Sequence, residues 1–94
     1  MKKIVLNGKK MFDLHSFYKE IQENLTKDLP FKMGSNLDAL YDILEGGYGV
    51  FDYHENIIIE WIFFSCAKEN IKESLDEILT IFKQCKHIKL ERID

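Results

Sequence analysis

The sequence lacks the features that would tie a small protein together covalently or hold it in a membrane. Only one proline and two cysteines occur in its 94 residues. No apolar run approaches the roughly 20 residues of a membrane-spanning helix. The three apolar residues at positions 4–6 are also too few for the core of a signal peptide. We therefore expect a cytoplasmic protein without a membrane partner, whose fold depends on one hydrophobic core.

The two cysteines, Cys66 and Cys85, lie 19 residues apart, a spacing that is compatible with a disulfide. Structural disulfides persist mainly in oxidising compartments. Since the sequence shows no export signal, we predict two reduced thiols packed in the protein interior.

Basic residues are missing from the middle of the chain. None occurs between Lys32 and Lys68, an interval that holds six acidic residues: Asp38, Asp42, Glu45, Asp52, Glu55 and Glu60. This interval therefore carries a charge of −6, and the remaining 13 basic and 10 acidic residues carry +3, which gives the net charge of −3. The asymmetry argues against direct binding of nucleic acid, because such binding needs cations beside the aromatic residues.

Motifs for catalysis or metal binding are also missing. There is no local motif around a Ser or Cys nucleophile and no HExxH pattern. The glycine-rich segment 46–49 lacks the GxGxxG spacing of a phosphate-binding loop. His15, His54 and His87 lie on different predicted elements without metal-ligand spacing, so we expect solvent-exposed or packed histidines. The sequence predicts a protein that is not an enzyme and has no cofactor or metal.

Hydrophobic periodicity predicts strands that alternate with helices. We expect strands at residues 3–7, 57–63 and 87–93, and helices after an N-cap at Asp13, over residues 35–46, at 66–70 and from 71 to about 86. The first strand should be buried, and the second, an apolar run without alternation, should be covered on both faces. The pattern predicts a single α/β domain over residues 1–94, with a three-stranded parallel sheet packed with about four helices.

Two residues of the second strand are expected to be structural. Glu60 interrupts an apolar run, which is favourable only where another group pairs with its carboxylate. Trp61, which follows it, is expected to pack in or beside the core.

The helix expected at residues 35–46 has clear signals at both ends. Ser35 is a good N-cap, Asp38 three residues later can complete a capping box, and Gly46 can leave the helix at a positive φ. Its apolar residues fall within one arc of about 100°. They are Leu37, Leu40, Ile43 and Leu44. This arc should face the core.

Asp38, Asp42 and Glu45 fall within about 60° on the opposite side of the same helix, and we call these three residues the acidic face. A polar arc is usually only a solvated surface, and the helix dipole and capping already explain Asp38. However, Asp38 and Asp42 form an i,i+4 like-charge pair that costs about 0.2–0.5 kcal/mol. Asp42 also lies past the first turn, where the dipole no longer favours an acid. The acidic face is therefore our candidate binding surface.

A dense pattern of residues surrounds this helix. It runs Gly34-x-Asn36-Leu37-Asp38-Ala39-Leu40-Tyr41-Asp42-x-Leu44-x-Gly46 and is followed by Ile58-Ile59-Glu60-Trp61. With Val5-Leu6-Asn7-Gly8, Asp13-Leu14-His15 and Phe82, nearly the whole chain resembles the barstar family, the intracellular inhibitors of the bacterial ribonuclease barnase. The resemblance implies a fold of three parallel strands with helices packed around them.

The same resemblance implies a function, namely a protein inhibitor that blocks the cationic active site of a barnase-like ribonuclease with the acidic helix and the adjoining loop. Such an inhibitor has an antitoxin or immunity role and forms a 1:1 complex, and we expect a monomer when it is free. The implied partner-binding residues are Asn36, Asp38, Tyr41, Asp42, Glu45 and Gly46.

Individual roles follow from matching positions in the family. Asp42 corresponds to the aspartate that enters the phosphate-binding site of the enzyme, and Asp38 corresponds to a second acidic contact. Asn36 and Gly46 match further contact positions. Tyr41 stands where the family often has an interfacial tryptophan.

Three departures from the family pattern affect the periphery of this surface. Lys32 replaces a contacting tyrosine, Gln84 replaces a peripheral acidic contact, and the loop at residues 47–56 is longer. The longer loop either provides new specificity through its aromatic and acidic residues or simply packs on the domain. The alternative function is therefore a barstar-fold binding module whose acidic surface recognises another cationic protein or a different toxin nuclease.

Overall fold

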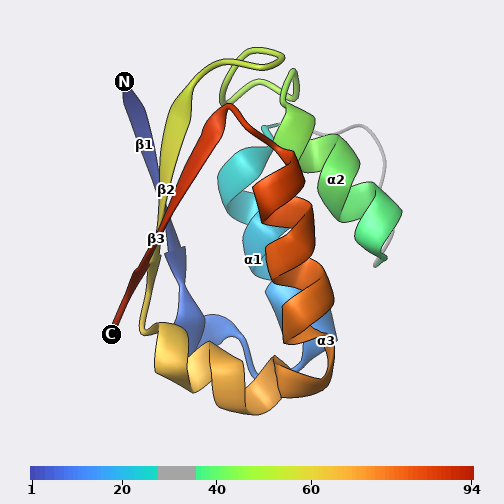
Figure 1. Ribbon diagram of the computed structural model, residues 1–94, viewed down its shortest axis with the longest axis vertical. Coiled ribbons are helices and arrows are strands. Elements are labelled where there is room, and N and C mark those ends of the chain that lie inside the picture. The colour runs from blue at the N-terminus through green and yellow to red at the C-terminus, as the bar shows by residue number, and fades with distance from the viewer. Residues whose placement is uncertain (28–35) are drawn as a thin grey trace.

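Three parallel strands in the order β1-β2-β3 form the sheet of the described part of the chain. The computed structural model describes residues 1–27 and 36–94. Strand β1 spans Lys2–Asn7, β2 spans Ile57–Ile62 and β3 spans Ile88–Ile93 (Figure 1). In the central strand, Ile57 lies opposite Lys2 of β1 and Ile88 of β3. The predicted parallel sheet is confirmed, with strand ends within one residue of those expected.

Helices α1 (Leu14–Leu25), α2 (Leu37–Glu45) and α3 (Phe64–Gln84), with a 3-10 turn at Gly8–Lys10, connect the described strands. Helix α3 bends at Ile71, where φ is −123° and ψ is 23°. Its two segments therefore correspond to the two helices predicted at residues 66–70 and 71–86. The α/β class is confirmed, and the bent α3 accounts for the expectation of about four helices. None of the described helices is long and apolar enough to cross a membrane.

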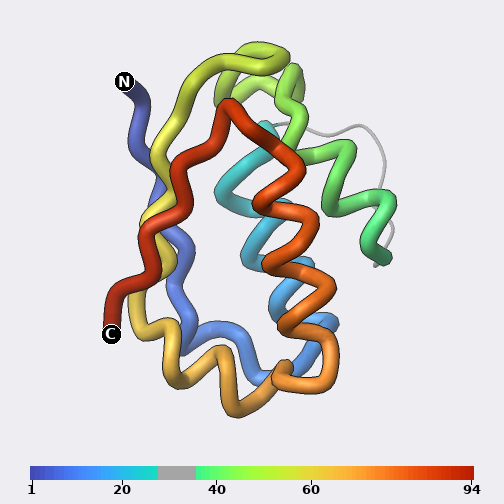
Figure 2. The backbone as a smooth tube through the Cα atoms, in the orientation of Figure 1, coloured from blue at the N-terminus to red at the C-terminus, as the bar shows by residue number. Residues whose placement is uncertain are grey.

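All of the described helices lie on one face of the sheet (Figures 1 and 2). Crossovers between parallel strands are right-handed as a rule. Because the steps from β1 to β2 and from β2 to β3 run in the same direction across the sheet, both crossovers place their helices on the same side. The opposite face of the sheet has no described element over it.

This one-sided arrangement corrects two expectations about burial. In β2 the buried Ile57, Ile59 and Trp61 alternate with half-buried residues, so the prediction of a strand covered on both faces is wrong. In β1, Ile4 and Leu6 are buried, but Val5 between them is 42% exposed, so the strand is only half buried.

Trp61 lies at the centre of the core, as predicted, and is fully buried. Its ring packs against aromatic rings of α1 and α3, with centroid separations of 5.7 Å to Phe17, 4.9 Å to Phe64 and 6.0 Å to Phe82. Its indole Nε1 has no hydrogen-bond partner among the described residues. Trp61 therefore packs the central strand β2 against both α1 and α3.

Glu60, the other residue of β2 expected to be structural, points to the open face of the sheet. Its carboxylate lies 3.5 Å from Nζ of Lys3 on the neighbouring strand β1. Lys3 is therefore the partner that we expected for the Glu60 carboxylate, which interrupts the apolar run of β2.

The two cysteines are free but differ in exposure. Cys85 is buried, whereas Cys66 is exposed, so the prediction of packed thiols is right for Cys85 and wrong for Cys66. Burial, together with the neighbouring charge of Glu45, raises the pKa of the Cys85 thiol to about 11. Both burial and the raised pKa suppress formation of the reactive thiolate.

We expect only Cys66 to react rapidly with a thiol reagent such as DTNB in the native protein, because Cys85 is shielded. Cys85 should react at a comparable rate only after unfolding in denaturant. The measurement is the number of thiols modified with and without denaturant, and Cys66→Ser should abolish the rapid phase. Two rapid thiols in the native protein would contradict this placement of Cys85.

Candidate partner-binding site

Helix α2 begins at Leu37 because Asn36 caps it. The Asn36 side chain accepts a hydrogen bond of 2.8 Å from the backbone N–H of Ala39. The expected cap, Ser35, lies outside the described residues, and the observed cap is one residue later, so Asp38 cannot be the third residue of a capping box. Serine and asparagine are about equally good N-caps, which is why the sequence did not decide between them.

The two sides of α2 are divided as predicted. Leu40, Ile43 and Leu44 are buried, and Leu37 packs against the core. On the opposite side Asp38 and Asp42 are exposed, and Glu45 is more enclosed, with 14% of its side chain exposed. The acidic face is thus a convex surface with two exposed carboxylates and one partly covered carboxylate.

Asp42 is held by the loop that follows the helix. The hydroxyl of Tyr48 donates a hydrogen bond to the Asp42 carboxylate, and this bond raises the pKa of Tyr48. Among the described residues, the ion pairs are Lys3 with Glu60 and His54 with Glu45. In this part of the chain neither Asp38 nor Asp42 is therefore paired with a cation.

Glu45 is held by groups on two sides. The neighbouring hydroxyl of Tyr41 lowers the pKa of Glu45, and the contact with His54 lowers it further. The carboxylate of Glu45 in turn raises the pKa of Tyr41, which remains 38% exposed. Tyr41 therefore lies beside a carboxylate of the acidic face while its own ring stays accessible.

The end of α2 requires glycine. Gly46 has a φ of +100°, which confirms the predicted helix end at a positive φ. A Cβ at this position would lie 2.5 Å from the backbone oxygen of Asp52 and 2.8 Å from the ring of Phe51. The loop can therefore return close to the helix terminus only because residue 46 has no side chain.

The longer loop at residues 47–56 packs on the domain. The Tyr48 backbone oxygen accepts a hydrogen bond of 2.8 Å from the N–H of Lys27, and the N–H of His54 donates a bond of 2.8 Å to the Glu45 oxygen. Phe51 is buried, whereas Tyr53 is 67% exposed. Packing thus accounts for Phe51, and Tyr53 is the aromatic residue of this loop that is available to a partner.

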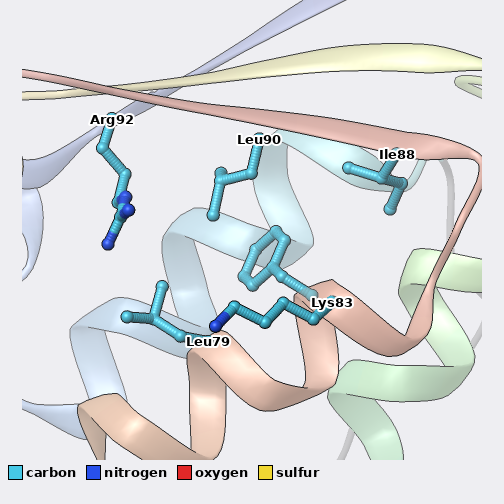
Figure 3. A pocket seen from close by; sticks show the side chains of 6 residues that line it. Leu79, Lys83, Ile88, Leu90 and Arg92 are labelled. Carbon is cyan, nitrogen blue, oxygen red and sulfur yellow. The ribbon is translucent and has the colours of Figure 1, made fainter.

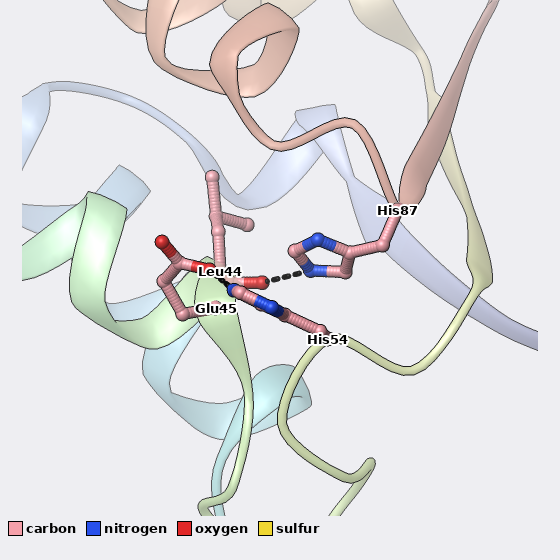
Figure 4. A network of polar contacts seen from close by, with 4 residues as sticks. All are labelled: Leu44, Glu45, His54 and His87. Carbon is pink, nitrogen blue, oxygen red and sulfur yellow. Dashed lines mark hydrogen bonds and ion pairs between the residues drawn. The ribbon is translucent and has the colours of Figure 1, made fainter.

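The loop also brings two histidines together. His54 from the loop and His87 from the turn before β3 lie beside Glu45, with potential ligand atoms of all three within 4.8 Å of one another (Figure 4). His54 is exposed and His87 is half buried, in agreement with the prediction of solvent-exposed or packed histidines, but the sequence spacing did not predict that the two lie side by side. His15 is exposed on α1, as predicted. These three clustered side chains are the described residues that could hold a metal ion.

One signal in the sequence could have revealed this pair. His54 comes three residues before β2, and His87 comes immediately before β3. The two strands are parallel neighbours, and Ile57 lies opposite Ile88, so residues that precede them meet at the same edge of the sheet.

A pocket of about 280 Å³ lies at one side of the acidic face. Its lining residues come from α2, the loop, the end of α3 and the turn after it: Tyr41, Glu45, His54, Gln84, Cys85, Lys86 and His87. Gln84 thus lies near Glu45 of the acidic face, and Lys86 adds a cation there. Lys32, the other departure, lies outside the described residues.

A second pocket, of about 210 Å³, has a different character. Figure 3 shows apolar side chains of α3 and β3 with Lys83 and Arg92 at the rim. It lies between α3 and β3, and its lining residues include none of the acidic face. Neither pocket encloses Asp38 or Asp42, so these carboxylates lie on an open surface suited to contact with another protein.

The fold and the acidic face describe a class of protein, namely a small α/β protein with exposed carboxylates on an open helix surface. The family model Barstar (barnase inhibitor) matches residues 1–93. The chain therefore belongs to the barstar family, whose members are inhibitors and not enzymes.

Proposed function

We propose that this protein inhibits a barnase-like ribonuclease by placing the acidic face of α2, with the adjoining loop, in the cationic active site of the enzyme. The observation that carries this proposal is the pair of exposed carboxylates, Asp38 and Asp42, on a capped helix without a paired cation in the described residues. The complex is 1:1, and the free inhibitor is a monomer.

The chemistry of the enzyme makes a carboxylate a suitable ligand. A ribonuclease binds phosphate through arginine and lysine, and these side chains form strong, short hydrogen bonds with carboxylates as well. Asp42 takes the central position in the phosphate site, and Asp38 makes the second acidic contact. Tyr41, Asn36 and Gly46 contribute the surrounding contacts.

Rigidity of the helix supports tight binding. The Asn36 cap, the buried apolar side of α2 and the hydrogen bond from Tyr48 fix the position of Asp42 before the enzyme arrives. Association then costs less conformational entropy than it would for carboxylates on a mobile segment. Opposite charges on inhibitor and enzyme also raise the association rate, most strongly at low salt.

The direct test is inhibition of a barnase-like ribonuclease over a range of inhibitor and salt concentrations. We expect 1:1 inhibition that weakens as salt rises, because the attraction between exposed charges is screened. A well-folded protein that leaves the enzyme fully active at low salt would reject the proposal.

A second candidate keeps the acidic surface but changes the partner to a different toxin nuclease or another cationic protein. Gln84, which stands where the family pattern has an acidic contact, favours it, and Lys86 adds a cation beside the acidic face. Binding to such a protein, with no inhibition of barnase-like enzymes, is the result that would establish this alternative.

Tyr48→Phe should weaken binding of the ribonuclease about fivefold, because one hydrogen bond worth about 1 kcal/mol no longer holds Asp42. The phenyl ring keeps the half-buried packing of Tyr48. We expect a faster dissociation rate and a nearly unchanged association rate, since the charge of Asp42 remains. Stopped-flow association and dissociation rates provide the measurement. An unchanged dissociation rate would show that Tyr48 does not position Asp42.

A further inference from the structure

Three potential metal ligands from three separate segments meet at the carboxyl end of α2. Glu45 is the last residue of the helix, His54 belongs to the loop, and His87 lies in the turn before β3. Figure 4 shows Glu45 and the two imidazole rings gathered around the end of α2, beside the backbone oxygen of Leu44. Their potential ligand atoms lie within 4.8 Å of one another.

We propose that Glu45, His54 and His87 form a binding site for a Zn²⁺ ion. Two imidazole nitrogens and a carboxylate oxygen are a ligand set that Zn²⁺ accepts, with about 2.0–2.2 Å between metal and ligand atoms. The Glu45 carboxylate and Nε2 of His54 are already in contact. The remaining adjustment is small, because 52% of the His54 side chain is exposed and the ring can turn without moving the core.

The end of the helix provides a fourth group. Nε2 of His87 lies 2.8 Å from the backbone oxygen of Leu44. When Nε2 of His87 binds Zn²⁺, the ring hydrogen moves to Nδ1, as in the other neutral tautomer. The Leu44 oxygen beside it can then bind the same ion from the side, so that the ligand set is two nitrogens and two oxygens. The carboxyl end of a helix carries a partial negative charge, which stabilises a cation at this place.

The fold places the ligands without help from the metal. His54 has a φ of +58°, and its N–H donates a 2.8 Å hydrogen bond to the oxygen of Glu45. The ring of His54 also stacks on that of Tyr53, with centroids 3.9 Å apart. His87 is fixed by the sheet, since its oxygen accepts a 3.0 Å bond from the N–H of Ile57. Ligands that are already in position reduce the ordering cost of metal binding.

A neighbouring hydroxyl completes the arrangement. Tyr41 lines the same pocket as Glu45, and polar neighbours of this kind commonly orient the carboxylate that binds a metal. Lys86 also lines the adjacent pocket, and its positive charge disfavours the binding of a metal cation. Glu45 is also a residue of the acidic face, but the zinc site does not depend on the proposed inhibition, because its ligands and its test involve no nuclease.

The first experiment is calorimetric titration of the untagged, metal-free Cys66→Ser protein with ZnCl₂. This background removes the exposed thiol, which could bind Zn²⁺ by itself. We expect one Zn²⁺ per chain, and a rise in the thermal midpoint of roughly 10–20 °C when free Zn²⁺ is a hundredfold above its Kd. Mg²⁺ at the same concentration should leave the midpoint unchanged, because it prefers oxygen ligands in an octahedral arrangement.

Variants then locate the site. His87→Gln and His54→Asn each remove an imidazole, and asparagine tolerates the positive φ at position 54. We expect each variant to remain folded by far-UV circular dichroism and to bind Zn²⁺ more than roughly tenfold more weakly. His15→Gln is the matched control, because His15 is exposed on α1 and outside the cluster. It should bind Zn²⁺ as the background protein does.

Two results would overturn the proposal. One is the absence of Zn²⁺ binding to the folded background protein. The other is binding that persists unchanged in both His54→Asn and His87→Gln, which would place the ion elsewhere.

Discussion

Asp42→Ala is expected to weaken inhibition of a barnase-like ribonuclease by about 30-fold to about 5,000-fold. This range corresponds to the roughly 2–5 kcal/mol lost when one partner of a desolvated charge pair is removed. The loss arises because the arginines and lysines of the enzyme remain buried in the complex without the carboxylate that they had bound.

The fold should tolerate this substitution. Asp42 is exposed, alanine is a better helix former than aspartate, and the change removes the like-charge repulsion with Asp38. The substitution also removes the hydrogen bond from Tyr48, which offsets these gains, so we expect the free energy of unfolding of Asp42→Ala to lie within about 1 kcal/mol of that of the wild type. The measurement is the inhibition constant at two salt concentrations, together with a denaturation curve for each protein.

Glu69→Ala is the matched control for Asp42→Ala. Glu69 is exposed on the first segment of α3, which lies at the opposite end of the molecule from the carboxyl end of α2 (Figure 1). It removes one negative charge and therefore affects long-range attraction similarly, but no contact is expected there. We predict a change of less than threefold, within the roughly 0.5 kcal/mol of ordinary surface substitutions. Equal losses in the two variants would assign the effect to net charge and reject Asp42 as the central contact.

The amphipathic character of α2 could be predicted from the sequence because it depends only on local spacing. Leu40 and Leu44 are four residues apart and are both buried, while Asp38 and Asp42, with the same spacing, are both exposed. The exact start of the helix could not be predicted, because Ser35 and Asn36 are both suitable N-caps for the free N–H groups of the first turn. The difference in free energy between two such caps is too small for a sequence pattern to resolve.

The open face of the sheet illustrates a second limit. The isoleucines of β2 form a continuous apolar run, which resembles a strand covered on both sides. Coverage depends instead on where the crossovers pass, and that is decided by strand order and handedness. Ile58 is therefore half buried, although its neighbours Ile57 and Ile59 are fully buried. Strand order is a property of the whole chain, so a local pattern could not show it.

The cluster at Glu45 was missed for a related reason. His54 and His87 are 33 residues apart, and each taken alone is an ordinary histidine. They meet because Gly46 lets the loop fold back onto α2 and because β2 and β3 are parallel neighbours in register. Gly46 and the strand register determine this geometry, whereas Glu45, His54 and His87 provide the potential metal ligands. Local motifs therefore predicted the acidic face, whose residues share one helix, but not the zinc site.

Trp61→Ala is expected to lower the free energy of unfolding by about 3–5 kcal/mol, the range for truncating a large buried aromatic residue. Trp61 is fully buried and packs between Phe17 of α1 and Phe82 of α3, so its loss leaves a cavity at the centre of the core. Small domains are stable by only about 5–15 kcal/mol, so the variant should be close to its unfolding threshold.

Trp61→Phe should cost much less, below about 2 kcal/mol, for two reasons. Phenylalanine keeps an aromatic ring among Phe17, Phe64 and Phe82, and it removes the indole N–H that has no partner among the described residues. Because Trp61 is the single tryptophan of the chain, unfolding in urea must be followed by far-UV circular dichroism and not by tryptophan fluorescence. Phe12→Ala, at an aromatic residue that is 70% exposed, should change stability by less than about 0.5 kcal/mol.

These core variants also separate stability from binding. Trp61 packs on α1 and α3, whereas the proposed contacts with the ribonuclease lie on the exposed side of α2. The folded fraction of Trp61→Phe should therefore inhibit with the affinity of the wild type, although it unfolds at a lower urea concentration. A loss of affinity in Trp61→Phe that matches Asp42→Ala would show that the core controls the shape of the acidic face. Equal stability of Trp61→Ala and the wild type would contradict the central position of this side chain.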